Sequence, residues 1–328
     1  MEQRRFSGKG HWYHETQSNH SQTDVLPLVP EAANVDDRFM LDLALPDDIL
    51  ASCAGWLAPA RTLCHLLFPL DTPVSRLHTL SAYDRLSTAL TVAQACGVQR
   101  LCNHYAALLA PLPGPDSSRE SNRRLAEITQ YARQLASSPD VIDDKAQNQL
   151  DEVGLTTYDI VLINQIIGFV GFQARVVAVF QALLGHPVRW LPGHHIQPHT
   201  LPVSFSRWTA TLPAVELKYA SALQLEALSR WQAEPALEAL TPVLCHEPML
   251  LNLTGEILLN HPLSEGPASS MISAARALLV ASPDRFSAAQ LTPLTGSGLS
   301  PEKAINLLTR DAFYGWLDRL RVALGKEE

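Results

Sequence analysis

The sequence lacks the features that mark secreted, nucleotide-binding or nucleic-acid-binding proteins. Polar residues follow Met1–Arg5 in place of the apolar stretch of a signal peptide. No glycine-rich phosphate loop, nucleotide fingerprint or Ser-His-Asp arrangement is present. The net charge is −8, and the one group of basic residues, Arg119, Arg123 and Arg124, is interspersed with acidic and serine residues. We therefore expect no bound cofactor and no nucleic-acid partner.

Cysteine is scarce and irregularly spaced. The 328 residues include five cysteines, an odd number in a long chain. They are Cys53, Cys64, Cys96, Cys102 and Cys245. Without a secretion signal, this pattern is typical of reduced thiols, and it predicts a cytoplasmic protein.

One apolar stretch, residues 160–184, is long enough to raise the question of a membrane span. It contains several polar side chains, and a charged arginine near its middle is costly in a bilayer. These residues are Asn164, Gln165, Gln173, Arg175 and Gln181. We expect the stretch to be a buried helix of a bundle, and we expect no membrane partner.

Glycine is also scarce, with 16 residues, and no alternating apolar and polar run of strand length stands out. The chain is rich in alanine and leucine, and its apolar residues recur at helical spacing. This pattern predicts an all-α fold. The predicted helices cover residues 46–68, 83–96, a segment through 104–109, 119–137, 143–152, 157–184, 215–233, 235–244, 248–259, 267–280, 287–294 and 301–324.

Proline-rich segments divide these helices into regions. Residues 1–35 are polar and predict an N-terminal arm. Residues 186–214 contain five prolines and four histidines and predict a linker. The remaining segments, 36–185 and 215–328, predict two helical domains.

Histidines gather in the arm and in the linker. We expect the arm to pack through its aromatic residues and the linker to be flexible and solvated. Zinc binding is the alternative at both places. These histidines are His11, His14 and His20 in the arm and His194, His195 and His199 in the linker. The pair Cys245-His246 would need two further ligands that the nearby sequence does not supply. We interpret the pair as a core cysteine beside a loop histidine, and we expect no metal.

An internal repeat relates the two domains. Residues 131–180 align without gaps on residues 275–324, and ten of the fifty positions are identical. The identical pairs are Leu135/Leu279, Ser138/Ser282, Pro139/Pro283, Asp140/Asp284, Leu150/Leu294, Gly154/Gly298, Leu155/Leu299, Phe169/Phe313, Gly171/Gly315 and Arg175/Arg319. The repeat predicts two tandem related halves that pack like a dimer of single-domain proteins, with a pocket at the shared interface. We interpret the repeated aromatic residues as core and the repeated arginine as paired with an acidic residue.

Three stretches carry a resemblance to a known family. The stretch LSAYDRLSTALTVAQACGVQRLCNHYAALL is similar to the motif helices of the carboxymuconolactone decarboxylase and AhpD-like family. The stretches VGLTTYDIVLINQIIGFVGFQARVVAVFQALLG and SGLSPEKAINLLTRDAFYGWLDRLRVALG resemble the helices that follow those motif helices. The resemblance implies an AhpD-like helical bundle in each half, with the second half shortened because its motif helices are missing. It also implies a homo-oligomer and the reduction of hydroperoxides by a thiol pair.

The sequence departs from the family at the motif that carries this chemistry. Active members have a Cys-x-x-Cys pair, a histidine four residues later and a glutamate about a dozen residues earlier. If His104 takes the histidine position, the cysteine positions fall on Gly97 and Arg100. The glutamate position then falls near Asp84 or Arg85. The best remaining candidates are a rewired pair, Cys96 and Cys102, with His104 as the acid or base and Asp84 as the carboxylate. The alternative is two ordinary buried thiols and a histidine on the surface of a helix.

Two functions remain open from the sequence. The family resemblance implies an oxidoreductase of the alkylhydroperoxidase type with an altered thiol site and a hydroperoxide substrate. The incomplete motif favours a non-catalytic member that binds a small molecule or a protein, or that joins family members into an assembly.

Overall fold

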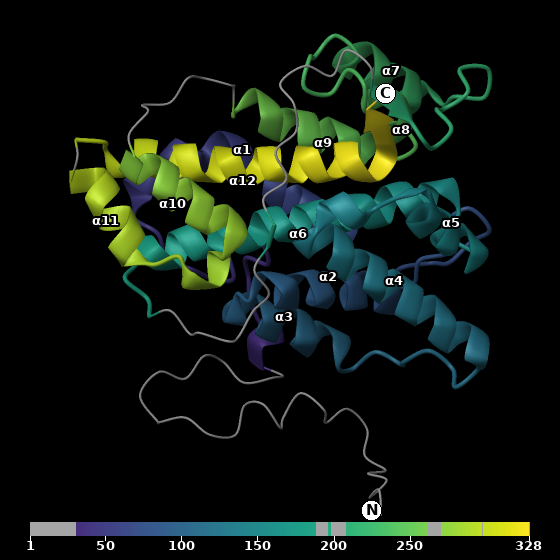
Figure 1. The fold of residues 1–328 in the computed structure, drawn as a ribbon, viewed down its shortest axis with the longest axis horizontal. Helices are drawn as coiled ribbons and strands as arrows, with labels where there is room; N and C mark the ends of the chain where they lie inside the picture. Colours follow the sequence, from purple (N-terminus) through teal and green to yellow (C-terminus); the bar gives the residue numbers. More distant parts are fainter. Residues whose placement is uncertain (1–30, 188–195, 198–207, 262–269, 297, 328) are drawn as a thin grey trace, which may run out of the picture.

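The computed structural model describes residues 31–187, 196–197, 208–261, 270–296 and 298–327 (Figure 1). Within these residues the chain forms twelve α-helices, three short 3-10 helices and one two-stranded sheet. The prediction of an all-α fold is confirmed. Residues 1–30 of the predicted arm and most of the predicted linker lie outside the described residues. Residues 31–33 of that arm form a short 3-10 helix.

The first half contains six helices, four of which begin at a side-chain cap. Ser81 and Thr156 each begin a helix with a capping box, in which the hydroxyl and an aspartate three residues later satisfy two backbone N–H groups. The elements are η1 (Glu31–Ala33), α1 (Asp47–Leu67), α2 (Ala82–Cys96), α3 (Gln99–Leu109), α4 (Arg119–Ser137), η2 (Pro139–Val141), α5 (Asp144–Glu152) and α6 (Thr157–Leu183). The predicted helices of this half are present with nearly the predicted bounds.

The second half differs from prediction at its beginning. Its elements are β1 (Trp208–Ala210), α7 (Ala222–Trp231), α8 (Thr241–Leu244), α9 (Pro248–Leu259), α10 (Ser270–Ala281), η3 (Pro283–Arg285), α11 (Ala288–Gly296), α12 (Pro301–Leu324) and β2 (Gly325–Glu327). The helix predicted at 235–244 is wrong for residues 235–240. Pro242 lies inside that predicted helix, where it lacks an N–H and clashes with the carbonyl four residues earlier, so α8 begins only at Thr241 with Pro242 in its first turn. The helix predicted from residue 215 begins only at 222, after a capping box at Ser221.

A short sheet joins the end of the predicted linker to the C-terminal segment. Strands β1 and β2 pair antiparallel, with Trp208 opposite Glu327 and Ala210 opposite Gly325. The indole of Trp208 also donates a hydrogen bond to the carbonyl of Arg321. Residues 208–210 are therefore attached to the second half instead of forming open linker, and a three-residue strand is too short to leave an alternating sequence pattern.

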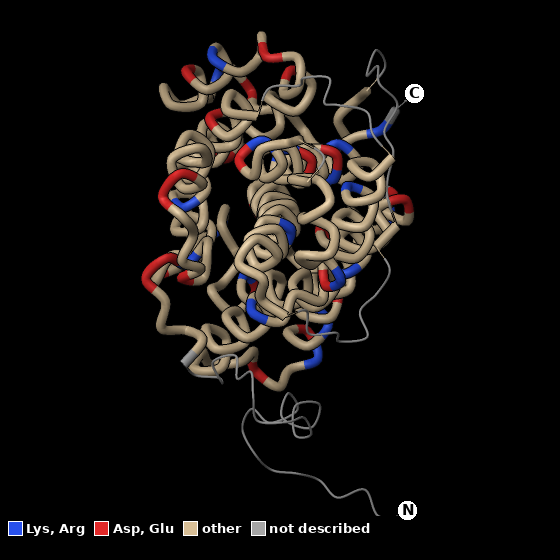
Figure 2. Tube along the Cα trace, turned by 90° about the vertical axis from the view of Figure 1, so that its left-hand side faces the viewer, with Lys and Arg blue, Asp and Glu red and all other residues tan. Residues whose placement is uncertain are grey.

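Helices α6 and α12 lie side by side in the centre of the molecule (Figure 1). Every residue from Asp159 to Phe180 is buried, because α2 and α4 pack on α6 from one side while α12 packs on it from another. By length and composition α6 could cross a membrane, but 89% of its most apolar stretch is buried inside the protein. In Figure 2 the charged residues lie mostly around the outside of this helical core.

Residues 144 positions apart adopt the same backbone conformation in the two halves. Ser138 has φ −147° and ψ 68°, and Ser282 has φ −152° and ψ 67°. Gly154 and Gly298 have φ of 86° and 94°, a left-handed conformation that glycine adopts without strain. The segments that precede α6 and α12 therefore fold alike.

Aromatic rings join α6 to α12 through matching contacts. Phe172 of α6 contacts Phe313 of α12 with ring centres 5.9 Å apart, and Phe169 contacts Trp316 at 5.8 Å. These two contacts are equivalent under the offset of 144, and Phe172 stacks on its own equivalent, Trp316, at 6.0 Å. Gly168 leaves the space that the Trp316 indole occupies. The two long helices therefore meet about a local twofold axis near Phe172 and Trp316.

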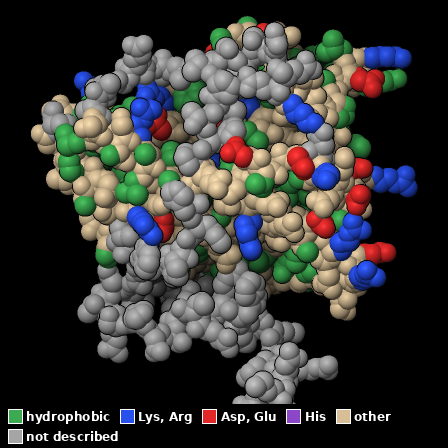
Figure 3. All heavy atoms as spheres, in the orientation of Figure 1, with side chains coloured by type: hydrophobic (Ala, Val, Ile, Leu, Met, Phe, Trp, Pro, Cys, Tyr) green, Lys and Arg blue, Asp and Glu red, His purple; other side chains and the backbone are tan. Residues whose placement is uncertain are grey.

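Surface charge is unevenly distributed on the face seen in Figure 3. Charged side chains gather over α4 and α5, whereas fewer lie over α10 and α11 (Figure 3). On α4, Arg123 forms an exposed ion pair with Glu152 of α5. The interpretation of the α4 arginines as a solvated helix face agrees with the exposure of Arg119 and Arg123 but is wrong for Arg124, whose partly buried guanidinium donates to backbone carbonyls of the first half.

Candidate functional site

The four residues singled out from the sequence lie on α2 and α3. Cys96 is the last residue of α2, and Gly97, with φ 71°, reverses the chain into α3. Cys102 and His104 lie on α3, and Asp84 lies in the first turn of α2. The exposed fractions of Cys96, Cys102 and His104 are 2%, 8% and 2%. The side chains of these three residues are therefore shielded from solvent.

Two buried arginines, one from each half, act on the Cys96 thiol. The guanidinium of Arg175 on α6 donates a hydrogen bond to the sulfur, and Arg319 on α12 interacts with it electrostatically. The positive charge of Arg175 also lowers the pKa of Arg319. Arginines from both long helices, α6 of the first half and α12 of the second, therefore act on Cys96.

The two arginines bind the opposite half in a reciprocal way. Nη2 of Arg175 donates to the carbonyl of Val280 at 2.7 Å, and Nη2 of Arg319 donates to the carbonyl of Ala136 at 3.1 Å. Each arginine also donates from Nη1 to the carbonyl four residues earlier on its own helix. Val280 and Ala136 are themselves equivalent under the offset of 144. The expectation of an acidic partner for Arg175 is wrong, because backbone carbonyls and a thiol take its hydrogen bonds.

Burial and the arginines act on the Cys96 thiol in opposite directions. Burial raises the pKa of Cys96 above its ordinary value, while the charges of Arg175 and Arg319 and the hydrogen bond from Arg175 oppose the increase. Burial and the repulsion between the two guanidinium groups lower the pKa of Arg319 to about 10. A thiolate at Cys96 would stabilise the charged form of both arginines, because its negative charge raises their pKa values.

Cys102 is the second thiol of the cluster. Burial, together with the neighbouring Cys96, raises the pKa of Cys102 to about 12. The structure thus brings Cys96 and Cys102 into electrostatic contact across the turn at Gly97. All five cysteines are free and buried.

His104 does not join the two thiols. Its Nδ1 donates a hydrogen bond to the carbonyl of Ala32 at 2.9 Å, so Nδ1 carries the proton. Burial lowers the pKa of His104 to about 4, and Arg38 and Asp42 are the charged groups that act on it. Residues two apart on a helix point to different sides, so His104 and Cys102 face different neighbours. The predicted relay from cysteine to His104 is not assembled.

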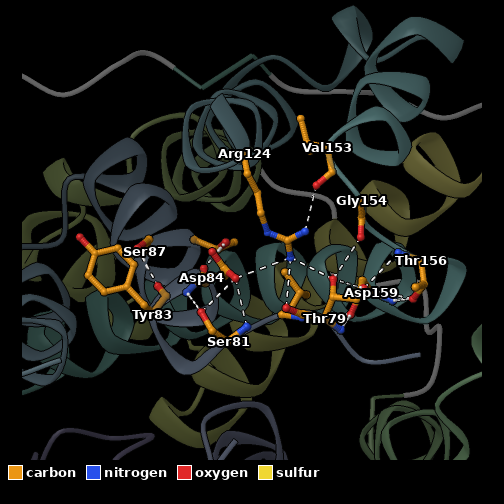
Figure 4. A network of polar contacts seen from close by, with 12 residues as sticks. Thr79, Ser81, Tyr83, Asp84, Ser87, Arg124, Val153, Gly154, Thr156 and Asp159 are labelled. Carbon is orange, nitrogen blue, oxygen red and sulfur yellow. Dashed lines mark hydrogen bonds and ion pairs between the residues drawn. The ribbon is translucent and has the colours of Figure 1, made fainter. Parts of the chain in front are cut away.

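Asp84 belongs to a network that fastens the helix starts together (Figure 4). Its carboxylate accepts hydrogen bonds from the backbone N–H and the hydroxyl of Ser81, and it lies 3.6 Å from Arg124. Arg124 donates to the carbonyl of Thr79, whose N–H donates to Asp159 on α6 (Figure 4). These contacts give Asp84 a structural task at the opposite end of α2 from Cys96.

A second polar cluster lies between the halves. Glu247, just before α9, is 3.4 Å from Nδ1 of His78, and Arg85 on α2 also acts on it. Burial raises the pKa of Glu247 to about 7. His246 donates from Nε2 to the carbonyl of Pro213, which agrees with its interpretation as a loop histidine beside a buried cysteine.

Metal binding finds no support in the part of the chain that the structure describes. There, no group of three or more histidine, cysteine, aspartate or glutamate side chains could hold a metal ion. The histidines considered as zinc ligands lie outside the described residues: His11, His14, His20, His194, His195 and His199.

Sequence reasoning located the thiols but missed the arginines as their neighbours. Arg319 lies more than two hundred residues from Cys96, so no local motif connects them. The sequence does contain one signal for the arginines: an arginine occupies the same position in both repeats, among apolar residues. No protein-family model matches the sequence, and no curated protein is significantly similar to it.

Proposed function

We propose that this chain is a thiol oxidoreductase of the AhpD-like, alkylhydroperoxidase type, in which Cys96 is the reactive thiol and Cys102 the second thiol. The observation that carries the proposal is the position of Cys96 between Arg175 and Arg319, with Cys102 beside it. A thiolate is the form of cysteine that attacks peroxides, and adjacent cations favour it. This arrangement takes the place of the incomplete family motif.

The proposed reaction uses each thiol once. The Cys96 thiolate attacks the terminal oxygen of a hydroperoxide ROOH, the O–O bond breaks, and Cys96 becomes a sulfenic acid while the alkoxide takes up a proton to leave as ROH. Cys102 then attacks the sulfenic sulfur, which forms a disulfide and releases water. An external dithiol reduces the disulfide by exchange. Because this cycle needs a reducing environment, we place the activity in the cytoplasm.

The second half supports the proposal by acting as a built-in second subunit. It supplies Arg319, which donates to a carbonyl of the first half. Its α12 packs on α6 through two ring contacts that are equivalent under the offset of 144. A dimer of single-domain proteins would provide the same pair of arginines at a twofold interface. We propose that the two halves descend from such a protein, and that the shortened half keeps the interface.

Turnover of a hydroperoxide with dithiothreitol as reductant tests the proposed function. Cys96→Ser should abolish the turnover. Cys102→Ser should slow it and let the sulfenic acid on Cys96 accumulate, because only dithiothreitol then remains to reduce that sulfenic acid. Cys53→Ser is a matched control, because Cys53 is equally buried but lies on α1. Unchanged turnover in Cys96→Ser, or no turnover in the unmodified protein, would refute the proposal.

One observation favours the alternative of a non-catalytic member that binds a small molecule or another protein. His104 faces Ala32 instead of the thiols, and burial raises the pKa of Cys102 far above neutrality. Under this alternative the arginines and Cys96 only stabilise the contact between the halves. Arg175→Met would then weaken folding, while every thiol of the unmodified protein would resist hydroperoxide.

A further inference from the structure

Side chains from both halves meet in the polar cluster around Glu247. Oε1 of Glu247, just before α9, lies 3.4 Å from Nδ1 of His78, in the segment between α1 and α2. The ring of Tyr158 on α6 contacts the ring of His78 at 5.1 Å and that of His246 at 4.9 Å between centres, both edge to face. His78 and Tyr158 belong to the first half, whereas His246 and Glu247 belong to the second. We call these four side chains the joint.

Two polar atoms beside Glu247 are buried without a hydrogen-bond partner. Nε2 of His246 donates to the carbonyl of Pro213, so Nδ1 is an acceptor, and it has no partner among the residues that the structure describes. Nε of Arg85 on α2, whose charge acts on Glu247, is likewise buried and unpartnered within that part of the chain. Each atom loses its hydrogen bond to water when the joint closes and regains it when the joint opens. This gain favours local opening.

The surroundings of the Glu247 carboxyl disfavour its charge. Burial has the largest effect, and it raises the pKa of Glu247 from 4.5 to about 7. Two charged groups act in opposite directions: Arg85 of α2 lowers this pKa, and Asp159 of α6 raises it. The other titratable groups at the joint are His78, Tyr158 and His246. An ionised Glu247 is therefore more favourable in an open joint, where water solvates the carboxylate.

We propose that the pair His78 and Glu247 is a pH-sensitive latch between the two halves. The protonated carboxyl of Glu247 donates to Nδ1 of His78 and occupies the buried position without a charge. When the proton leaves, the joint opens and hydrates the carboxylate. The side chain of His78 is 41% exposed, so solvent reaches the pair and can take up the proton. Helices α6 and α12 hold the halves together throughout, so the opening is confined to residues 75–80 and 245–251.

The size of the opening follows from the two pKa values of Glu247. The closed joint binds the proton with a pKa of about 7, and the open joint binds it with the ordinary value of 4.5. The closed joint is therefore favoured most below pH 4.5, and this preference is lost as the pH rises through 7. Between pH 6 and pH 8 the ratio of open to closed joints should rise about tenfold.

Hydrogen exchange of backbone amides in the full chain, followed by mass spectrometry at pH 6 and pH 8, tests the latch. The rates are corrected for the pH dependence of exchange in unstructured peptides. Residues 75–80 and 245–251 should exchange faster than residues 166–174 at the centre of α6, because the joint opens without unfolding of the chain. After correction, the two joint segments should exchange about tenfold faster at pH 8 than at pH 6.

Two glutamates of the second half provide a matched pair of variants. Glu247→Gln replaces the carboxyl by a neutral amide of the same shape, so the joint segments should keep their slow exchange at pH 8. Glu256 on α9 is exposed and lies 3.5 Å from Arg230, and Glu256→Gln should retain the change with pH. Equal rates at both pH values in the unmodified chain, or a change with pH that persists in Glu247→Gln, would overturn the proposal.

A titration of the unmodified chain decides the matter if Glu247→Gln does not fold. With carbon-13 at the glutamate carboxyls, nuclear magnetic resonance should show one glutamate with a midpoint near pH 7. Midpoints below about pH 5.5 for every glutamate would overturn the latch. Exchange of the joint segments at the same rate as residues 166–174 would also overturn it, since the joint would then open only when the whole chain unfolds.

Discussion

Replacement of Gly168 by alanine tests the contact between the two long helices. In the interior of an isolated helix this change stabilises by about 1 kcal/mol. Here, a Cβ on Gly168 would overlap the indole of Trp316, which is almost fully buried. Overpacking costs about 1–3 kcal/mol when neighbours shift slightly, and more when a large ring must leave its place. We expect Gly168→Ala to lower the free energy of unfolding by about 2 kcal/mol or more, measured by urea denaturation.

Gly171 in the same helix is the control. A Cβ there would meet only Nη1 of Arg175 at 3.5 Å, an ordinary contact. Gly171→Ala should therefore gain up to about 1 kcal/mol, and the two variants should differ by about 3 kcal/mol. Trp316→Phe should restore part of the stability of Gly168→Ala by making room. If Gly168→Ala were as stable as Gly171→Ala, the packing of α6 against α12 through Trp316 would be refuted.

Three further predictions concern buried polar groups. Arg175→Met and Arg319→Met each remove a charged hydrogen bond to the opposite half, so both should lose about 3 kcal/mol in chemical unfolding; a large loss in only one would contradict the matched geometry. Burial raises the pKa of Glu247 from 4.5 to about 7, so the folded state retains a proton that the unfolded chain releases, and stability should fall by about 3 kcal/mol as the pH rises from 4.5 through 7. Glu247→Gln should remove this slope in a series of unfolding curves. Asp159→Asn should lose about 2–4 kcal/mol in thermal unfolding, because its carboxylate accepts from both the N–H and the hydroxyl of Thr79; an unchanged midpoint would exclude this role.

The helix bounds could be predicted where a local signal determines them. Ser81, Thr156 and Ser300 each precede a helix and cap its first N–H groups, and the structure begins α2, α6 and α12 directly after them. Residues 235–240 could have been excluded from a helix, because Pro242 is tolerated only in the first turn of a helix. The pairing of β1 with β2 could not be predicted, since each strand has three residues and the partners are more than a hundred residues apart.

The candidate site could be predicted only in part. The family resemblance directed attention to Cys96, Cys102 and His104, which are close in the sequence. His104 and Cys102 are two residues apart on α3, so their side chains point to different sides of the helix. The imidazole of His104 donates instead to the carbonyl of Ala32, a buried residue beside it. Arg319 comes from the other half, so its position depends on how α12 packs against α6 and not on any motif near Cys96.

The reactive pair of thiols is the central claim, and mass spectrometry after one equivalent of hydroperoxide tests it most directly. Tryptic cleavage after Arg85, Arg100 and Arg119 places Cys96 and Cys102 in different peptides, so a disulfide between them would join two separable fragments. We predict that the joined pair appears in the unmodified protein and is absent after reduction. Folded protein in which both thiols stay reduced, or in which oxidation falls on Cys53, Cys64 or Cys245 instead, would contradict the claim.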